Sequence, residues 1–206
     1  METALVAPAL VAPALVAPAP VAPALVAPAL VAPALVAPAT TEIPTYSKLY
    51  WGPRVWRLFH TLAEISNRRD VLGIWYTVLM TTAESMPCAQ CRTHFSAYLR
   101  ANPITFVKRG MLITGPQTRD KIRNELWKFH NVVNKSTGKE EKSIDILLEQ
   151  HGAKTRNELL LEAQSLVNEL KGIWEPLVYK QIRAKAFHDW KRALYLLLLV
   201  LKGGPN

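Results

Sequence analysis

Apolar residues recur at helical spacing along most of the chain beyond residue 44. In the first such stretch Trp51, Val55 and Leu58 lie three or four positions apart, which places them on one face of a helix. Prolines and glycines interrupt the pattern at a few points and end the periodic stretches. The pattern predicts four helices, over residues 48–66, 70–85, 88–101 and 117–136. No stretch is typical of a strand, and the short connections favour an all-α, antiparallel four-helix bundle.

The pattern continues beyond Gly138 and predicts a helical C-terminal extension over residues 140–206. Its helices are expected near 155–172 and 177–201, separated by Pro176. The last nine apolar residues, Ala193 to Leu201, would span roughly 13 Å as a helix against a hydrocarbon core of about 30 Å. They cannot cross a bilayer, so we expect a packed helix end or a dimer face. The alternative is an interfacial anchor flanked by basic residues.

A different material precedes the helices. From Ala4 to Pro38 the unit Ala-Leu-Val-Ala-Pro occurs seven times, with one variation at residues 19–23. A proline every five residues excludes a membrane-spanning helix and favours disorder or polyproline II. We expect residues 1–43 to form a stalk, or alternatively an arm that binds a partner or itself, and we find no signal peptide or transit peptide in it. The predicted domains are thus residues 1–43, 44–139 and 140–206.

Positive charge is concentrated after the arm. The chain has 25 Lys and Arg against 16 Asp and Glu, and Glu2 and Glu42 are the only charges before residue 44. A basic surface suits a phosphate-bearing cofactor, nucleic acid or an anionic membrane surface. Because the basic residues are scattered and no nucleic-acid-binding signature accompanies them, we expect no nucleic-acid partner.

The two cysteines form a C-x-x-C pair, Cys88 and Cys91, at a predicted helix start. The helix dipole and the neighbouring Arg92 would lower a cysteine pKa, and the spacing allows a small disulfide, which favours thiol exchange. A structural zinc site would need four ligands, and His94 and His130 match no finger spacing. Thioredoxin-type chemistry would need a βαβ context, and two inert thiols are the remaining alternative.

Histidines, amides and tryptophan gather at helical spacing near this pair. Trp56 and His60 lie four positions apart, as do His130 and Asn134, with Asn131 beside them. Each has a simpler account as a core or capping residue, and buried amides need partners from another molecule or chain segment. Together, aromatic rings, amides, basic residues and a dithiol would suit a flat aromatic cofactor with a phosphate tail.

These residues resemble the Erv/ALR family of flavin-linked sulfhydryl oxidases over about residues 48–139. The resemblance lies in Trp-Gly-Pro-x-x-Trp-x-x-x-His at 51–60, Pro-Cys-x-x-Cys-x-x-His-Phe at 87–95, Asn102-Pro103, and His-Asn-x-Val-Asn with Gly138-Lys139 at 130–139. It implies a four-helix bundle with a short fifth helix, a homodimer, and FAD as cofactor. It also implies a reaction in which a dithiol and O2 give a disulfide and H2O2.

The resemblance assigns roles to individual residues. Cys91 would be the thiol next to the flavin, and Cys88 the interchange thiol that receives electrons from the substrate. The positions implied for FAD binding are Gly52, Trp56, His60, His94, His130, Asn131, Val133, Asn134, Lys135 and Lys139. Trp127 lies closer to the His-Asn motif than in many relatives, which leaves its role open.

The chain lacks the additional cysteine pair that relays electrons in cellular relatives. This minimal set, with a helical extension, resembles the oxidases of large cytoplasmic DNA viruses. The resemblance implies disulfide formation in virion proteins, in the host cytoplasm or the virion, with a protein dithiol substrate or a thioredoxin-like carrier as partner. The competing hypothesis is a non-enzymatic helical interaction or virion structural protein, and a zinc-binding module is the third.

Overall fold

The computed structural model describes residue 44, residues 46–102 and residues 115–204. These residues form seven α-helices and a 3-10 turn, with no strand among them, which confirms the all-α prediction. The elements are α1 Lys48–Glu64, α2 Val71–Ser85, α3 Ala89–Ala101, α4 Gly115–Ser136, α5 Ile144–Gly152, α6 Arg156–Trp174, η2 Glu175–Leu177 and α7 Ala184–Lys202. They all belong to the compact unit Thr41–Asn206, and the predicted arm over residues 1–43 lies outside the described residues.

The first four helices begin and end close to the predicted limits. Ser47 caps α1, where its hydroxyl accepts a hydrogen bond from the Leu49 backbone N–H. The apolar stripe of α1 is buried, with Trp51 and Leu58 both under 4% exposed. At the start of α4, a Cβ added to Gly115 would clash with the carbonyl oxygen of Asn67. Glycine therefore allows α4 to begin directly against the loop between α1 and α2.

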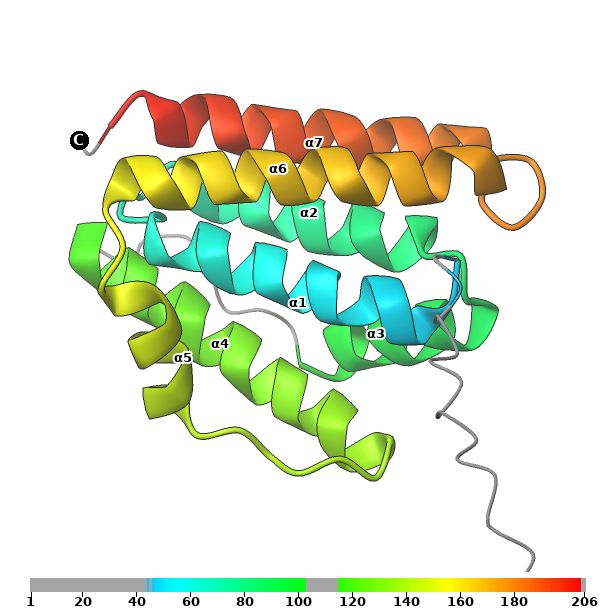
Figure 1. Cartoon of the computed structure of the whole chain (residues 1–206), viewed down its shortest axis with the longest axis horizontal. Coiled ribbons are helices and arrows are strands. Elements are labelled where there is room, and N and C mark those ends of the chain that lie inside the picture. Colours follow the sequence, from blue (N-terminus) through cyan, green and yellow to red (C-terminus); the bar gives the residue numbers. More distant parts are fainter. Residues whose placement is uncertain (1–43, 45, 103–114, 205–206) are drawn as a thin grey trace, which may run out of the picture. The chain divides into compact units, whose positions relative to one another are not determined.

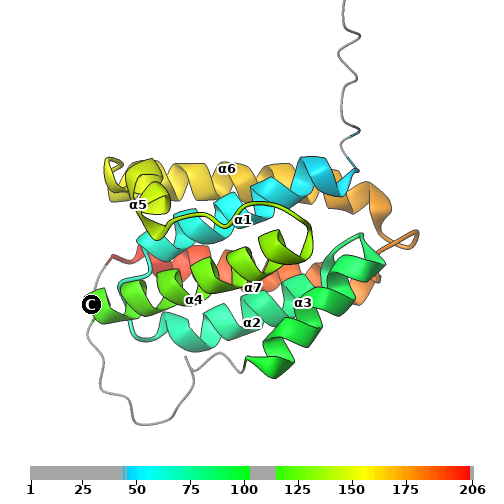
Figure 2. The same cartoon turned by 90° about the horizontal axis from the view of Figure 1, so that it is seen from below.

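The C-terminal extension packs along the first two helices. Helix α6 lies along α1, and α7 lies along α2 (Figure 1). On the opposite side of α1 and α2, α4 packs against α1 and α3 packs against α2 (Figure 2). Helix α2 is consequently buried on more than one side, which agrees with its high apolar content; Tyr76, Thr77 and Glu84 remain exposed.

One continuous hydrophobic core joins the extension to the bundle. The ring of Trp174 in α6 contacts Trp51 of α1 edge to face, with centroids 5.7 Å apart, and lies 4.6 Å from Trp190 of α7. In the apolar C-terminal stretch, Leu194, Leu197 and Leu201 are fully buried. The prediction of a packed helix end is confirmed. Among the described helices, none combines the length and apolar character that crossing a bilayer requires.

The last two predicted helices differ in extent from the observed ones. The helix expected over 177–201 begins at Ala184, because η2 and a tight turn occupy residues 175–183. Within this turn Tyr179 adopts a φ of 67°, which no helix accommodates. Helix α5 has no counterpart in the periodicity; it corresponds to the short fifth helix that the family resemblance implied.

Candidate active site

The C-x-x-C pair lies at the start of α3, as the sequence predicts. Cys88 is the N-cap residue, and its Sγ accepts a hydrogen bond of 3.1 Å from the backbone N–H of Cys91. The two cysteines form a disulfide with their Cα atoms 5.1 Å apart. Both side chains are half-buried and pack against the hydrophobic core. The helix start therefore offers a hydrogen-bond donor and the positive end of a dipole to a thiolate at Cys88.

Arg92 holds the loop that precedes the disulfide. Its Nη1 donates to the carbonyl oxygens of Met86 at 2.5 Å, Pro87 at 3.3 Å and Gln181 at 3.2 Å. These bonds attach the redox loop to the turn between α6 and α7. The sequence suggested that Arg92 lowers a cysteine pKa. The observed bonds show that it positions the backbone of the redox loop, and the residue types around it in the sequence gave no sign of this role.

Two predicted histidines and a tryptophan meet between α1 and α4. His60 Nε2 lies 3.0 Å from His130 Nδ1. The ring of Trp56 stacks on His130 with centroids 4.2 Å apart and planes 6° from parallel. Phe129 of α4 meets Trp56 edge to face at 5.2 Å, which closes the cluster from the core side. The histidines lie 70 positions apart in the chain. Together with Trp56 and Phe129 they form one aromatic cluster between α1 and α4.

Burial keeps both histidines neutral. Burial first, and then the neighbouring His130 and His151, together lower the pKa of His60 from 6.5 to about 3. The pKa of His130 falls to about 4, first through burial and then through the positive charges of Lys139 and Lys142. Since one proton is shared across the short nitrogen–nitrogen contact, one ring donates and the other accepts.

An aromatic chain continues from this cluster toward α3. Tyr98 stacks on Phe129 with centroids 3.9 Å apart and planes 1° from parallel, and Phe95 meets Phe129 at 4.4 Å. Both Phe95 and Tyr98 lie on α3, the helix that begins at the cysteine pair. The packing of Phe129 therefore fixes the orientation of α3 relative to the histidine pair.

Asn131 serves the segment that follows α4. Its Nδ2 donates to the Lys142 carbonyl at 2.9 Å, and its Oδ1 accepts from the Lys142 N–H at 2.9 Å. Trp127 donates from Nε1 to the same carbonyl at 2.6 Å. The sequence predicted that a buried amide would need a partner from another segment, and for Asn131 this partner is the backbone of Lys142. Trp127, whose role the sequence left open, bonds the same backbone carbonyl. No sequence signal identifies Lys142, because only its backbone takes part.

The other predicted positions are distributed over the same helices. Gly52 and Val133 are half-buried and Asn134 is buried, whereas His94, Lys135 and Lys139 are exposed. The chain turns after α4 at Gly138, with a φ of 68°, and the Lys139 N–H then bonds the Asn134 carbonyl at 2.9 Å. This turn brings Lys139 back near His130.

The comparisons with known proteins match the part of the chain that contains this site. The model of the Erv1/Alr family matches residues 53–154. Two relatives from African swine fever virus, isolates Pig/Kenya/KEN-50/1950 and Tick/Malawi/Lil 20-1/1983, are named FAD-linked sulfhydryl oxidase. Both are 30% identical to this chain, the first over 95 residues and the second over 94. The alignments cover 44% of this chain and 71% of each relative. The chain belongs to the Erv1/Alr family.

The match to the Erv1/Alr family begins within α1, extends past the end of α5 and stops before α6. The matched region contains the cysteine pair and the Trp56–His60–His130 cluster, whereas α6 and α7 lie outside it. No solved structure gives a significant match to the chain. Helices α6 and α7, which pack on α1 and α2, therefore follow the part of this Erv1/Alr protein that matches the family.

The residues of the cluster fit the flavin cofactor of an Erv1/Alr oxidase. FAD has flat ring systems and a negatively charged pyrophosphate. His60 Nδ1 is buried and has no hydrogen-bond partner among the described residues, so it is available to a ligand group. Trp56 and His130 supply stacked rings, and Lys139 supplies a nearby positive charge. By contrast, no group of three His, Cys, Asp or Glu side chains gathers among the described residues as a metal site would require.

Proposed function

We propose that this protein is an FAD-linked sulfhydryl oxidase that forms disulfide bonds in substrate proteins, with Cys88 and Cys91 as its redox pair. The observation that carries the proposal is the half-buried Cys88–Cys91 disulfide at the start of α3 in an Erv1/Alr chain. The relatives' name, FAD-linked sulfhydryl oxidase, supports the same reaction. The enzyme is an oxidoreductase that acts on thiols with O2 as acceptor.

The chain's own chemistry is disulfide exchange. A substrate thiolate attacks Cys88 Sγ, the Cys88–Cys91 bond breaks, and a mixed disulfide forms between substrate and Cys88. The second substrate thiolate then attacks the substrate sulfur of the mixed disulfide, which forms the substrate disulfide and releases Cys88 as a thiolate. The substrate has lost two electrons and two protons and gained a disulfide, while Cys88 and Cys91 are reduced. The donor at Cys91 N, 3.1 Å from Cys88 Sγ, stabilises the leaving Cys88 thiolate.

Recovery of the disulfide requires an electron acceptor. FAD, when bound, supplies the two-electron chemistry that takes electrons from the cysteine pair and delivers them to O2 as H2O2. Trp56, His60 and His130 would hold it by stacking and hydrogen bonding. Gly52, His94, Asn131, Val133, Asn134, Lys135 and Lys139 complete the proposed binding set. Lys135 and Lys139 are exposed and positively charged, as recognition of a pyrophosphate needs.

The remaining assignments extend this function. Because the chain contains no other cysteine, the enzyme must receive electrons directly from a substrate dithiol or from a thioredoxin-like carrier. Its relatives are viral, so we place it in the host cytoplasm, acting on virion proteins, where thiols are otherwise kept reduced. We also propose a homodimer. A monomer that retains flavin would contradict this last point.

The first test is the visible absorption spectrum of the protein purified without added cofactor. We expect a flavin band that bleaches on addition of a dithiol and recovers with O2, together with oxygen uptake. A colourless protein that cannot be reconstituted with FAD would refute the oxidase. It would favour the non-enzymatic helical interaction protein instead, since such a protein needs neither flavin nor oxygen.

A further inference from the structure

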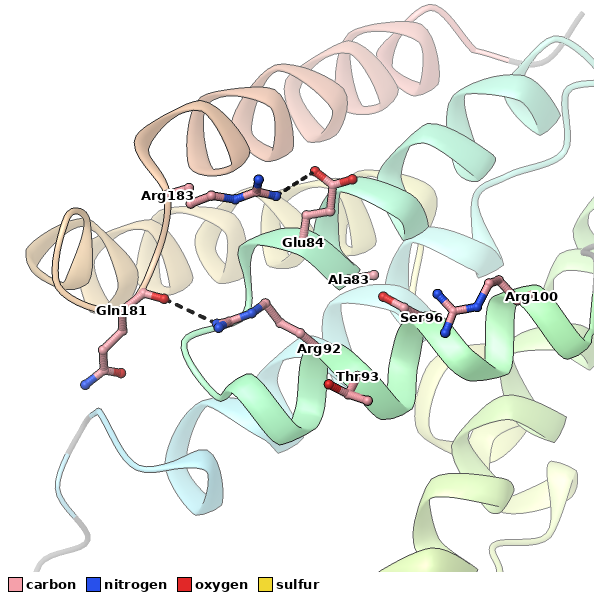
Figure 3. Close-up of a pocket in the computed structure, with 8 residues that line it drawn as sticks. All are labelled: Ala83, Glu84, Arg92, Thr93, Ser96, Arg100, Gln181 and Arg183. Atoms are coloured by element: carbon pink, nitrogen blue, oxygen red, sulfur yellow. Dashed lines mark hydrogen bonds and ion pairs between the residues drawn. The ribbon is translucent and has the colours of Figure 1, made fainter.

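A basic cleft is lined in part by α3, the helix that begins at the cysteine pair. It has a volume of about 430 Å³ and is lined by Glu84 of α2, by Arg92, Ser96 and Arg100 of α3, and by Gln181 and Arg183 of the turn before α7 (Figure 3). We call it the arginine groove. Clefts of about 300–1,000 Å³ are the size that holds ligands, so a short peptide segment fits this one.

Positive charge dominates the arginine groove. Arg92, Arg100 and Arg183 bring three guanidinium groups, and Glu84 is the single carboxylate of the lining. The pair between Arg183 and Glu84 is long, at 3.7 Å, and both side chains are more than half exposed. Such a pair contributes little and is easily exchanged for another carboxylate. Guanidinium groups bind carboxylates through two parallel hydrogen bonds, so an acidic occupant is favoured.

The arginine groove and the redox loop form one hydrogen-bonded unit. Arg92 directly follows Cys91 in the chain, and its Nη1 bonds the carbonyls of the two residues before Cys88. The same atom bonds Gln181 on the opposite wall at 3.2 Å (Figure 3). Through Arg92, a segment seated in this groove would contact a side chain that is bonded to the redox loop.

The turn before α7, which supplies Gln181 and Arg183 to the groove, contains a residue with an unusual backbone conformation. Two residues before Gln181, Tyr179 has a φ of 67° and is 89% exposed. Its N–H bonds the Ile182 carbonyl at 2.9 Å, which holds the turn in this conformation. A non-glycine residue in the left-handed region costs free energy, and such costs concentrate at functional sites. A fixed, exposed tyrosine is also the residue type that anchors protein interfaces.

We propose that the arginine groove docks the substrate protein and selects reactive cysteines flanked by an acidic segment. This inference rests on the proposed oxidase function, because docking beside Cys88 and Cys91 has meaning only if they exchange with a substrate. It assigns a task to part of the extension that lies outside the family match. Docking by charge raises the rate of encounter and falls as salt is added.

The test uses two peptides that differ only in charge. Each contains two cysteines, flanked by glutamates in one peptide and by glutamines in the other. With the full-length, flavin-loaded protein at low salt, we expect kcat/KM for the glutamate peptide to exceed that for the glutamine peptide about tenfold, from oxygen consumption. The double variant Arg100→Gln, Arg183→Gln should lose most of this preference. Equal values for both peptides in the wild-type protein would overturn the proposal.

Two controls separate docking from catalysis. Oxidation of dithiothreitol, which is too small to span the groove, should be unchanged in the double variant. Arg192→Gln, which removes an exposed arginine of α7 that does not line the groove, should leave the peptide preference intact. If the double variant still prefers the glutamate peptide, the arginine groove does not dock the substrate, even though both peptides are oxidised.

Binding measurements keep docking testable if oxidation fails. Absence of dithiothreitol oxidation would contradict the oxidase, not the groove. Labelled peptides with serine in place of cysteine should still bind by fluorescence anisotropy, the glutamate peptide more tightly, and the double variant should abolish the difference. Displacement by inorganic phosphate at ionic strengths where chloride has no effect would instead assign the groove to small anions. Tighter binding of a short single-stranded RNA, lost in the double variant, would assign it to nucleic acid; either result overturns the proposal.

Discussion

At the scale of single residues, the position of Cys88 separates its structural task from its chemical one. Its sulfur caps α3 by accepting the Cys91 N–H. A serine hydroxyl is a good acceptor at an N-cap. We therefore expect Cys88→Ser to keep the helix and the bound flavin while turnover with protein dithiols falls to background. The flavin absorption band and oxygen uptake, measured on the same sample, check both halves.

Ala97→Ser is the matched control for this substitution. It adds the same hydroxyl at an exposed position of the same helix, away from the cysteine pair. It should retain both flavin and turnover. Loss of flavin in Cys88→Ser would contradict the division of roles, because it would mean that Cys88 supports the cofactor site.

Residue-level prediction from sequence succeeds where chemistry resides in a side-chain type. Cysteines two apart at a helix start, and histidine four positions from tryptophan, are visible in the sequence, and the structure brings Trp56, His60 and His130 into contact. The contacts of Arg92 with Gln181 and of Asn131 with Lys142 were not predictable. They end on backbone atoms of distant segments, for which no side-chain pattern exists.

At the scale of elements, the His60–His130 contact joins α1 to α4 and makes their packing sensitive to pH. Both pKa values are depressed, from 6.5 to about 3 and about 4. Below pH 6.5 the unfolded chain binds more protons at these rings than the folded one. This contribution to stability is thus complete above about pH 6.5 and is lost as the pH falls toward 4 and 3.

Urea unfolding at pH 7.5 and 5.5 measures this dependence. As the pH falls from 7.5 to 5.5, the depressed pKa of each histidine should decrease the free energy of unfolding by up to about 1.4 kcal/mol. His60→Gln, which retains a polar side chain at the contact, should remove about half of the effect. His188→Gln, at an exposed position of α7, should leave it unchanged. Equal stability of the wild-type protein at the two pH values would show that the pair does not stay neutral.

The extents of the elements were predictable where a long apolar stripe meets a core. The buried stripes of α1 and α4 follow the predicted spacing, and their limits agree within two residues. The start of α7 was wrong by seven residues, because periodicity does not register the left-handed turn at Tyr179. Helix α5, only nine residues long, is too short for periodicity to distinguish it from a loop.

At the scale of the whole molecule, the extension is part of the core that supports the site. Trp174 and Trp190 are at most 1% exposed and join α6 and α7 to Trp51 of α1. Sequence predicted helices here but not the faces against which they pack, because an apolar stripe does not specify its partner. The prediction of a separate domain over residues 44–139 remains to be tested against this shared core.

Removal of α6 and α7 tests that question directly. A chain ending at Lys154 retains the whole family match but exposes the apolar residues of α1 and α2 that the extension buries. We expect it to lose cooperative thermal unfolding, measured by circular dichroism. In the full-length chain, Trp190→Ala should cost about 3–5 kcal/mol of unfolding free energy by loss of buried contacts. Leu199→Ala, at a position of the same helix that is 67% exposed, should cost far less. A truncated chain that unfolds cooperatively at the wild-type temperature would instead establish residues 44–139, with α5, as an independent oxidase domain to which the extension contributes only a docking surface.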